Sequence, residues 1–378
     1  MEHTFKNNTL IFFPEGRIDG DNAENFSAQV EKISGQCTAD EIVFDLSKIN
    51  YVSSAGLRIF LRFAKIFKDK MKIREVTPAV YDIFEMTAMT KILDVQRAFR
   101  KISVDGLAKL GRGTSGIVYR LDKENILKVY RENWTLEDVQ KEREKSQDAF
   151  LKGLSTAISY DVVKCGESFG IVYEMIDAKT LEQTILDDPE NMEEYSRRFA
   201  EFVKEQHRIE IDAPSFKQQR ISQAEKVKIY SAEERDLVRR ALEAVPECKN
   251  FSHGDLNLCN VLLKDGQFVM IDMGEIGSGH PIFDVSWIYF FYHLREKHNI
   301  EDAGPKKISG AIWKFFAQTY FNTKDEKIIE HYERELEPYA LITLLNATLK
   351  VNVPQDVRDF EKKALLSYIG RKIEPIDF

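Results

Sequence analysis

Three polar side chains in the C-terminal half of the sequence have the types and spacing that phosphoryl transfer needs. Asp255 ends the run Phe-Ser-His-Gly-Asp, Asn260 follows five residues later, and Asp272 begins the run Asp-Met-Gly. A carboxylate beside an acceptor hydroxyl can orient the hydroxyl and accept its proton. Asn and Asp side chains supply the hard oxygen ligands that Mg²⁺ prefers. We therefore expect Asp255 to act as the catalytic base and Asn260 and Asp272 to bind Mg²⁺.

A glycine-rich run, Gly-Arg-Gly-Thr-Ser-Gly, lies upstream between two strand candidates. Glycine allows backbone N–H groups to approach and cover nucleotide phosphates without a side-chain clash. A β-rich stretch follows the run in place of a helix, which favours a β-hairpin lid over a dinucleotide-binding turn. An ordinary glycine-rich hairpin turn would produce the same pattern. We expect four residues of this run to bind the nucleotide: Gly111, Gly113, Ser115 and Gly116.

Lys128 lies inside the apolar strand candidate Ile-Leu-Lys-Val-Tyr. A lysine in a buried strand is costly unless it is paired. Nucleotide phosphates and a carboxylate from the following helix could pair with it. That helix offers Glu142 and Glu144, which face different sides, so only one can reach inward, and we favour Glu144. The alternative is that Lys128 lies at a solvent-exposed edge and the helix charges form a solvated face.

Taken as a set, the His-Gly-Asp run with Asn260 and the Asp-Met-Gly run resemble the aminoglycoside phosphotransferase family. Members of that family are similar to protein kinases in fold, with His-Gly-Asp in place of His-Arg-Asp. The resemblance implies a nucleotide- and Mg²⁺-dependent kinase that transfers the γ-phosphate of ATP or GTP to a hydroxyl. The complete glycine pattern of the phosphate loop departs from many aminoglycoside enzymes and leaves the acceptor open.

The same resemblance assigns further residues. The Glu-Arg-Glu-Lys run that contains Glu142 and Glu144 resembles that family's helix, in which a glutamate pairs with the strand lysine. The segment from Tyr173 to Asp177 resembles the hinge between lobes, and the backbone of Glu174 and Ile176 would then bind the adenine. Asp284 resembles a structural aspartate that supports the catalytic loop.

The N-terminal segment contains Asp-Leu-Ser-Lys-Ile-Asn-Tyr-Val-Ser-Ser-Ala-Gly-Leu, which is similar to the signature of the STAS (anti-sigma-factor antagonist) domain. In signalling members a partner kinase phosphorylates a serine at the start of a helix, and the equivalent here is Ser54. A phosphate at a helix N-terminus is stabilised by free N–H groups and the helix dipole. Signalling members commonly have aspartate at the position of Ser53. Either serine could equally serve only as a helix N-cap.

The order of strand and helix candidates predicts the fold class and the domains. Strands alternate with helices over residues 1–98, which indicates a small STAS-like α/β domain. Closely spaced strands with one helix follow over residues 99–176, and residues 177–378 are mainly helical. The expected fold class is α/β plus α+β. With the resemblance, this means a STAS-like domain followed by a bilobal protein-kinase-like fold with a small β-rich lobe and a large helical lobe.

The composition indicates which kinds of partner the protein binds and in which cellular compartment it is expected. The net charge of -8 does not favour nucleic acid or an anionic membrane. The four cysteines are scattered, so neither a zinc site nor a disulfide framework is expected, and free thiols suit a reducing compartment. No signal peptide or membrane-spanning apolar run is visible. We expect a cytoplasmic protein.

Three functions fit these observations. The first is a small-molecule kinase with a regulatory STAS domain, which could also contact a protein partner. The second is a bacterial signalling protein kinase that phosphorylates its own Ser54 or a serine of a partner. The third is a switch protein whose kinase fold only senses nucleotide, although intact catalytic residues argue against it.

Overall fold

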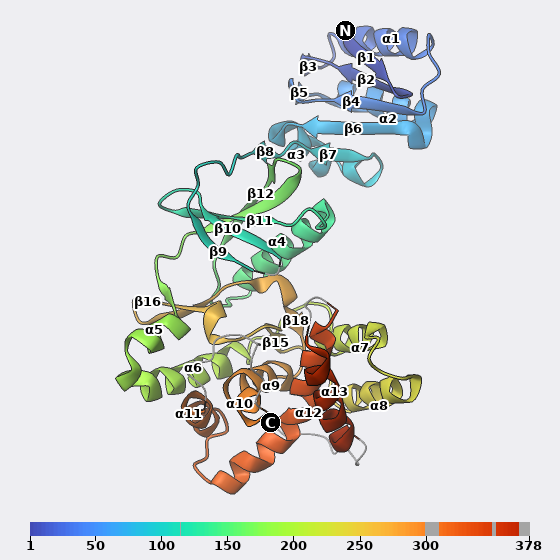
Figure 1. Cartoon of the computed structure of the whole chain (residues 1–378). Coiled ribbons are helices and arrows are strands. Elements are labelled where there is room, and N and C mark those ends of the chain that lie inside the picture. The colour runs from blue at the N-terminus through green and yellow to red at the C-terminus, as the bar shows by residue number, and fades with distance from the viewer. Residues whose placement is uncertain (114, 299–309, 350–352, 370–378) are drawn as a thin grey trace. The chain divides into compact units, whose positions relative to one another are not determined.

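The computed structural model describes residues 1–113, 115–298, 310–349 and 353–369. The chain forms two compact units, Met1–Lys101 and Ile102–Phe378 (Figure 1). Each unit is described by itself below.

The first unit is an α/β layer. Its strands are β1 (Glu2–Lys6), β2 (Thr9–Phe13), β3 (Gly16–Ile18), β4 (Glu41–Asp45), β5 (Ile49–Val52), β6 (Met71–Val76), β7 (Val95–Arg97) and β8 (Arg100–Lys101). Its helices are α1 (Ala23–Ser34), α2 (Ser54–Phe67) and α3 (Pro78–Met86), with 3₁₀ turns η1 (Lys68–Lys70) and η2 (Met89–Lys91). The main sheet has the order β1-β2-β4-β6-β7, with β1 antiparallel and the other neighbours parallel.

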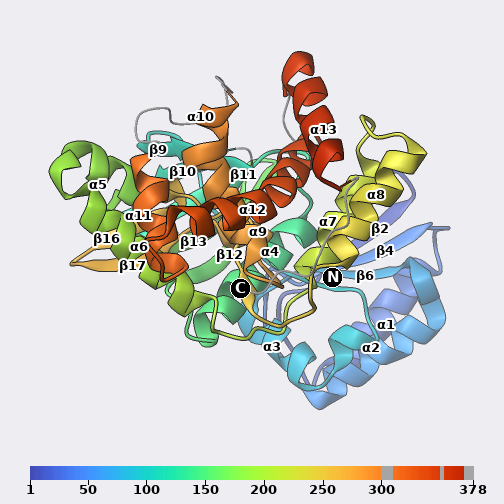
Figure 2. The same cartoon turned by 90° about the horizontal axis from the view of Figure 1, so that it is seen from below.

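The core of this unit lies between the sheet and the helices α1 and α2, which run side by side (Figure 2). Alternate residues of β2 and β4 are buried, as expected for strands with one covered face. The ring of Phe44 stacks on Phe63 of α2 at 5.4 Å between centroids, and Phe26 of α1 contacts both rings. Aromatic packing of this kind fixes both helices on the same face of the sheet.

The second unit begins with an antiparallel sheet that carries helix α4 (Leu136–Leu151). Its strands are β9 (Lys109–Arg112), β10 (Gly116–Arg120), β11 (Asn125–Tyr130), β12 (Ser159–Cys165) and β13 (Ser168–Glu174). They lie in the order β12-β13-β11-β10-β9, so β11 is a central strand. Thr135 begins α4 with a capping box, in which its hydroxyl accepts from the Asp138 N–H and the Asp138 carboxylate accepts from the Thr135 N–H.

The remainder of the second unit is mainly helical. Its helices are α5 (Leu181–Asp187), α6 (Met192–Gln206), α7 (Phe216–Lys226), α8 (Ala232–Glu243), α9 (Ile282–Tyr289), α10 (Arg295–Lys297), α11 (Ala311–Tyr320), α12 (Glu326–Ala347) and α13 (Gln355–Ile369). Short turns are η3 (Pro189–Asn191), η4 (Leu258–Asn260), η5 (Met273–Glu275) and the π-helical η6 (Phe290–Leu294). Short strands are β14 (Lys179–Thr180), β15 (Phe251–Ser252), β16 (Val261–Lys264), β17 (Gln267–Met270) and β18 (Gly277–Ser278). Strand β16 pairs antiparallel with β14 and β17, and β15 pairs with β18.

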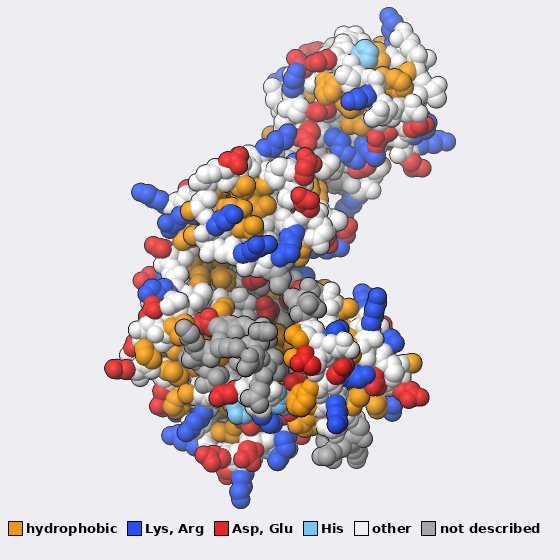
Figure 3. Space-filling view, in the orientation of Figure 1, with side chains coloured by type: hydrophobic (Ala, Val, Ile, Leu, Met, Phe, Trp, Pro, Cys, Tyr) orange, Lys and Arg blue, Asp and Glu red, His pale blue; other side chains and the backbone are white. Residues whose placement is uncertain are grey.

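The surface charges, the cysteines and the apolar character of the helices bear on the expectations from composition. On the face drawn in Figure 3, Lys and Arg side chains are interspersed with Asp and Glu over both units. All four cysteines are unpaired in the structure. Among the described residues, no helix combines the length and apolar character needed to cross a membrane.

Candidate active site

Asp255 lies in the loop between β15 and η4, and its carboxylate is held at both oxygens. Oδ1 accepts a hydrogen bond from the Trp287 indole Nε1 at 2.9 Å, and Oδ2 accepts one from Asn260 Nδ2 at 3.1 Å. Burial raises the pKa of Asp255, while the hydrogen bond from Trp287 opposes this and the charge of Asp272 adds to it. The two hydrogen bonds therefore fix the direction of the side chain.

Asp284 anchors the backbone just before Asp255. Its carboxylate is fully buried and accepts hydrogen bonds from the N–H groups of His253 at 2.6 Å and Gly254 at 2.8 Å. Burial alone would raise the pKa of Asp284, but the hydrogen bond with His207 and the neighbouring histidines keep it below its usual value. Gly254 has φ +83°, and a Cβ there would lie 2.7 Å from a ring carbon of Phe216, so glycine is required at this position.

The predicted metal ligands Asn260 and Asp272 belong to two segments that are tied together. The Ile271 N–H donates to the Asn260 carbonyl at 2.9 Å. Asp272 has φ +62°, a left-handed conformation. Since the amide nitrogen of Asn260 faces Asp255, its Oδ1 is the atom that remains for a cation.

These two residues fit a Mg²⁺ site, because one carboxylate and one amide oxygen leave the other positions to phosphate and water, the usual arrangement for this ion. Within the described residues, no group of three or more His, Cys, Asp or Glu side chains is arranged to bind a metal on its own.

Lys128 is buried on β11 and pairs with Glu142, so the prediction that Glu144 is its partner is wrong. Lys128 Nζ lies 2.8 Å from Glu142 Oε1 and 2.7 Å from Asp272 Oδ1. The Glu142 side chain is 3% exposed, whereas Glu144 is exposed. Residues two apart in a helix differ by about 200° in direction, so only one glutamate can face the sheet.

The sequence contains a pattern that favours Glu142 over Glu144 as the partner of Lys128. The inward face of α4 carries Val139, Glu142, Ser146 and Ala149, which follow the spacing of three and four residues. Burial of Lys128 alone would lower its pKa, but the charges of Asp272 and Glu142 outweigh this and raise it. Lys128 is therefore a fixed positive charge.

Two contributors to the site were not predicted. The Tyr130 hydroxyl donates to Glu142 Oε1 at 2.6 Å, so this oxygen serves both Tyr130 and Lys128. Tyr130 is two residues after Lys128 on the same strand and therefore lies on the same face. This spacing could have predicted that Tyr130 belongs to the site. The indole of Trp287, on α9, is the second contributor.

Gly111 lies in β9 and Gly116 begins β10, so the described residues of the glycine-rich run lie at the adjoining ends of these two strands. The Gly113 N–H donates to the Gly116 carbonyl at 2.9 Å, and the Ser115 carbonyl accepts from the Arg131 N–H at 3.1 Å. A Cβ on Gly116 would lie 2.1 Å from the carbonyl oxygen of Val129, so the sheet itself requires glycine there. At Gly111 and Gly113, by contrast, an added Cβ would meet no described atom within 4 Å.

The predicted hinge lies at the end of β13. The Glu174 N–H donates to the Ile158 carbonyl at 2.9 Å, and the Ile176 carbonyl accepts from the Ala178 N–H at 2.9 Å. The adenine prediction therefore concerns the other two backbone groups, the Glu174 carbonyl and the Ile176 N–H.

Comparison with known proteins places this geometry in a family. A model described as "Phosphotransferase enzyme family" matches residues 106–304, just over half of the chain. The chain belongs to this phosphotransferase family. A second model, the STAS domain, matches residues 1–102. The chain is 32% identical over 91 residues, 23% of this chain and 76% of the relative, to a candidate anti-sigma factor antagonist, BtrV, of Bordetella bronchiseptica.

Similar solved structures include aminoglycoside phosphotransferase APH(2'')-Ib bound to ADP, with 18% identity, coverage of 70% of this chain and 93% of that chain, and a TM-score of 0.44. A choline/ethanolamine kinase family protein from Mesorhizobium loti has 16% identity, coverage of 70% and 91%, and a TM-score of 0.47. Because these scores lie below 0.5, the assignment rests on the family models. The predicted family, the STAS fusion and the predicted fold class are confirmed.

In the STAS domain the two serines of the signature have different roles. Ser53 is the N-cap of α2, and its hydroxyl accepts from the N–H groups of Ala55 and Gly56 at 3.2 and 3.4 Å. Ser54 is the first residue of the helix and is exposed.

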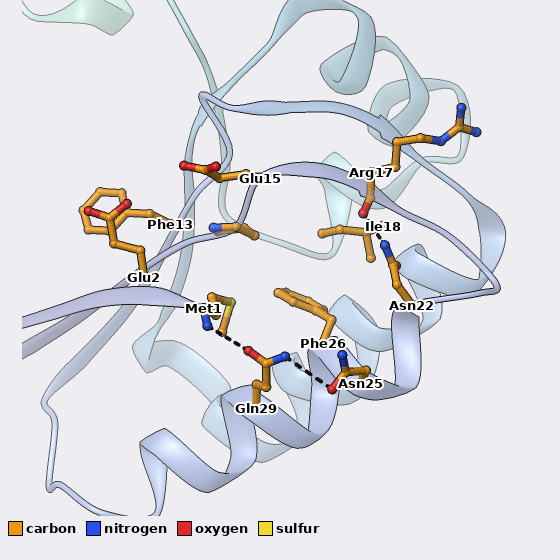
Figure 4. A pocket seen from close by; sticks show the side chains of 11 residues that line it. Met1, Glu2, Phe13, Glu15, Arg17, Ile18, Asn22, Asn25, Phe26 and Gln29 are labelled. Atoms are coloured by element: carbon orange, nitrogen blue, oxygen red, sulfur yellow. Dashed lines mark hydrogen bonds between the residues drawn. The ribbon is translucent and has the colours of Figure 1, made fainter.

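A pocket of about 500 Å³ also lies in this domain, lined by residues that include Arg17, Phe26 and Gln29 (Figure 4). Neither Ser53 nor Ser54 lines it.

Proposed function

We propose that this phosphotransferase is a Mg²⁺-dependent kinase that transfers the γ-phosphate of ATP or GTP to a hydroxyl of a small molecule. The observation that carries the proposal is the position of Lys128. Its ammonium contacts Glu142 of α4 and Asp272 after β17, and so joins three segments that are far apart in the sequence. A buried lysine held by one buried and one partly exposed carboxylate suits a group that must orient phosphates.

Each residue then has a defined task. Asp255 orients the acceptor hydroxyl and accepts its proton, and Asn260 holds one carboxylate oxygen of Asp255. Asn260 Oδ1 and the Asp272 carboxylate would bind Mg²⁺, which supplies charge neutralisation on the phosphates when bound. Lys128 orients the phosphates, and Glu142 fixes Lys128. In this proposal residues 99–176 form the small lobe and residues 177–378 the large lobe.

The glycine-rich run supports nucleotide binding by a separate argument. Gly116 is explained by the sheet, because a side chain there would clash with Val129. Gly111 and Gly113 are not explained in this way, since the described protein leaves room for a Cβ at both. Glycine costs conformational entropy, so its presence without a fold requirement suits a turn whose backbone must approach a ligand closely. The phosphates of the nucleotide are that ligand in this proposal, with Ser115 beside them.

The proposal is tested by nucleotide binding and turnover. We expect Mg-ATP or Mg-GTP to raise the melting temperature of the protein, because a ligand that binds only the folded state stabilises it. Product release with a panel of amino-alcohols, sugars and aminoglycosides then identifies the acceptor. Asp255→Asn should retain the nucleotide-induced stabilisation and lose turnover. If neither nucleotide stabilises the protein in the presence of Mg²⁺, the proposal fails.

A second candidate function is protein phosphorylation at Ser54, and the helix-start geometry favours it. Ser53 takes the N-cap position, and Ser54 is the first residue of α2 and is exposed, so the helix dipole would stabilise a phosphate on Ser54. The relative named as a candidate anti-sigma factor antagonist is compatible with a signalling role for this domain.

Mass spectrometry after incubation with Mg-ATP separates the two functions. Phosphate on Ser54 of the wild-type chain, absent in Ser54→Ala and in Asp255→Asn but retained in Ser53→Ala, would support a signalling kinase. Phosphate on a small hydroxyl compound and none on protein would support the small-molecule kinase.

A further inference from the structure

One helix supplies three hydrogen-bonding side chains to the loop that carries Asp255. Asp284 of α9 accepts the His253 and Gly254 N–H groups, as described above. Trp287, three residues later, donates its indole N–H to Asp255 Oδ1 at 2.9 Å. Tyr292, in η6, accepts the Leu258 N–H with its hydroxyl at 2.8 Å. The loop is therefore held before, at and after the proposed base by a single continuous segment.

The π-helical turn explains how three side chains of one helix can face the same loop. In a regular α-helix each residue adds about 100°, so Trp287 would point about 60° to one side of Asp284 and Tyr292 about 80° to the other side. A π-helical turn contains more residues and therefore rotates less per residue. Phe290–Leu294 forms such a turn, which brings Tyr292 back toward the face of Asp284. π-helical turns often occur at functional sites.

We propose that Trp287 is a positioning residue for Asp255: its indole N–H fixes one carboxylate oxygen so that the other faces Asn260 and the acceptor. This inference rests on the proposed function and deepens it. The torsion that rotates a carboxylate about its Cβ–Cγ bond is soft, so the direction of the carboxylate depends on its hydrogen bonds. The second donor near Oδ1, Asn257 Nδ2, is 3.5 Å away, at the limit of a hydrogen bond.

The indole is itself rigidly held, as a positioning group must be. Its ring stacks on Phe290 with centroids 4.9 Å apart and an interplanar angle of 7°, and Phe291 meets it edge-on at 4.8 Å. Trp287 is 9% exposed. Loss of the N–H alone should leave this packing in place, because phenylalanine can also stack there. The expected loss is the strength of one hydrogen bond to a charged group, which corresponds to about a 10- to 100-fold change in rate.

Trp313 provides a matched control in the same unit. It is buried on α11, and its indole N–H donates to a carboxylate oxygen of Glu333 at 2.7 Å. Trp313→Phe therefore removes the same atoms and the same kind of hydrogen bond at a carboxylate that is outside the proposed site.

The test measures release of ADP from Mg-ATP, with water as the acceptor, together with the KM for Mg-ATP and the melting temperature. We expect Trp287→Phe to lower kcat about 10- to 100-fold with an unchanged KM, and Trp313→Phe to leave kcat unchanged. In the Asp255→Asn background, Trp287→Phe should have no further effect, because it acts through Asp255. Equal kcat values for Trp287→Phe and Trp313→Phe, or a full additional loss in the Asp255→Asn background, would overturn the inference.

A spectroscopic measurement covers the case in which Trp287→Phe does not fold. The indole N–H resonances of ¹⁵N-labelled protein should include one that moves in Asp255→Asn while the resonance removed by Trp313→Phe stays in place. If no indole resonance moves, the inference is wrong. Failure of the proposed function looks different, because Asp255→Asn would then release ADP at the wild-type rate.

Discussion

Replacement of Glu142 by glutamine should destabilise the protein and weaken nucleotide turnover, whereas the same change at Glu144 should do neither. Glu142 is the desolvated partner of Lys128, with a side chain that is 3% exposed, while Asp272 is 46% exposed and its attraction is screened by solvent. Breaking a buried ion pair by removing one partner costs about 3–5 kcal/mol. Because Asp272 remains, we expect a loss of about 2–3 kcal/mol, to which the Tyr130 hydroxyl contributes by losing a charged acceptor.

For a unit of this size the loss corresponds to a fall of about 3–5 °C in melting temperature. Calorimetry of the wild type, Glu142→Gln and Glu144→Gln measures it, and Glu144→Gln should stay within about 0.5 kcal/mol of the wild type. Turnover of Mg-ATP should fall in Glu142→Gln, because an unfixed Lys128 no longer orients the phosphates. Equal effects of the two substitutions, or a larger effect at Glu144, would refute the pairing and the argument built on it.

Three further predictions concern separate features. Burial alone would lower the pKa of His298, but hydrogen bonds to Glu337 at 3.3 Å and Glu361 at 2.9 Å raise it to about 9. The protonated His298 therefore contributes stability that is complete below pH 6.5 and is lost as the pH rises through 9. The free energy of chemical unfolding should be lower at pH 10 than at pH 6 by at most about 3 kcal/mol from this source. In His298→Gln this part of the pH dependence should be absent. Gly116→Ala should lower the melting temperature because its Cβ meets Val129, whereas the same change at Gly113 should preserve it and raise the KM for Mg-ATP. Replacing the buried carboxylate that accepts two backbone N–H groups, Asp284→Ala, should cost about 3 kcal/mol in thermal unfolding, and an unchanged stability would contradict its anchoring role.

Elements with a clear amphipathic pattern could be predicted from the sequence. Examples are the strands Thr9–Phe13 and Met71–Val76 and the helix that Pro78 opens, because their apolar spacing and start signals are local. The strand Glu2–Lys6 was not predicted. All five of its residues are exposed, so it has no alternating pattern and depends on pairing with its neighbour β2.

The residues of the site also divide into those that the sequence predicts and those that it does not. Asp255, Asn260 and Asp272 could be predicted because the chemistry sets their types and the chain sets their spacing. The contacts that orient them were harder to predict, because each depends on a helical phase or on packing between distant segments. The choice between Glu142 and Glu144 required the rotation of α4, and the role of Trp287 required the position of α9 against the loop. A single π-helical turn, which no sequence pattern here indicates, changes the direction in which the Tyr292 side chain points.

The charge balance of the site links these contacts to the proposed chemistry. Among the four ionisable side chains Asp255, Asp272, Glu142 and Lys128, three are acidic and one is basic, so the group is net negative. This excess is one reason why the pKa of Asp255 is raised, since Asp272 adds to the effect of burial. The Lys128 ammonium has three N–H donors, and the carboxylates of Glu142 and Asp272 occupy two of them. Because Glu142 is desolvated and Asp272 is partly exposed, the contact with Asp272 is the weaker one, and it is the one that we expect to be exchanged when an Mg-nucleotide binds.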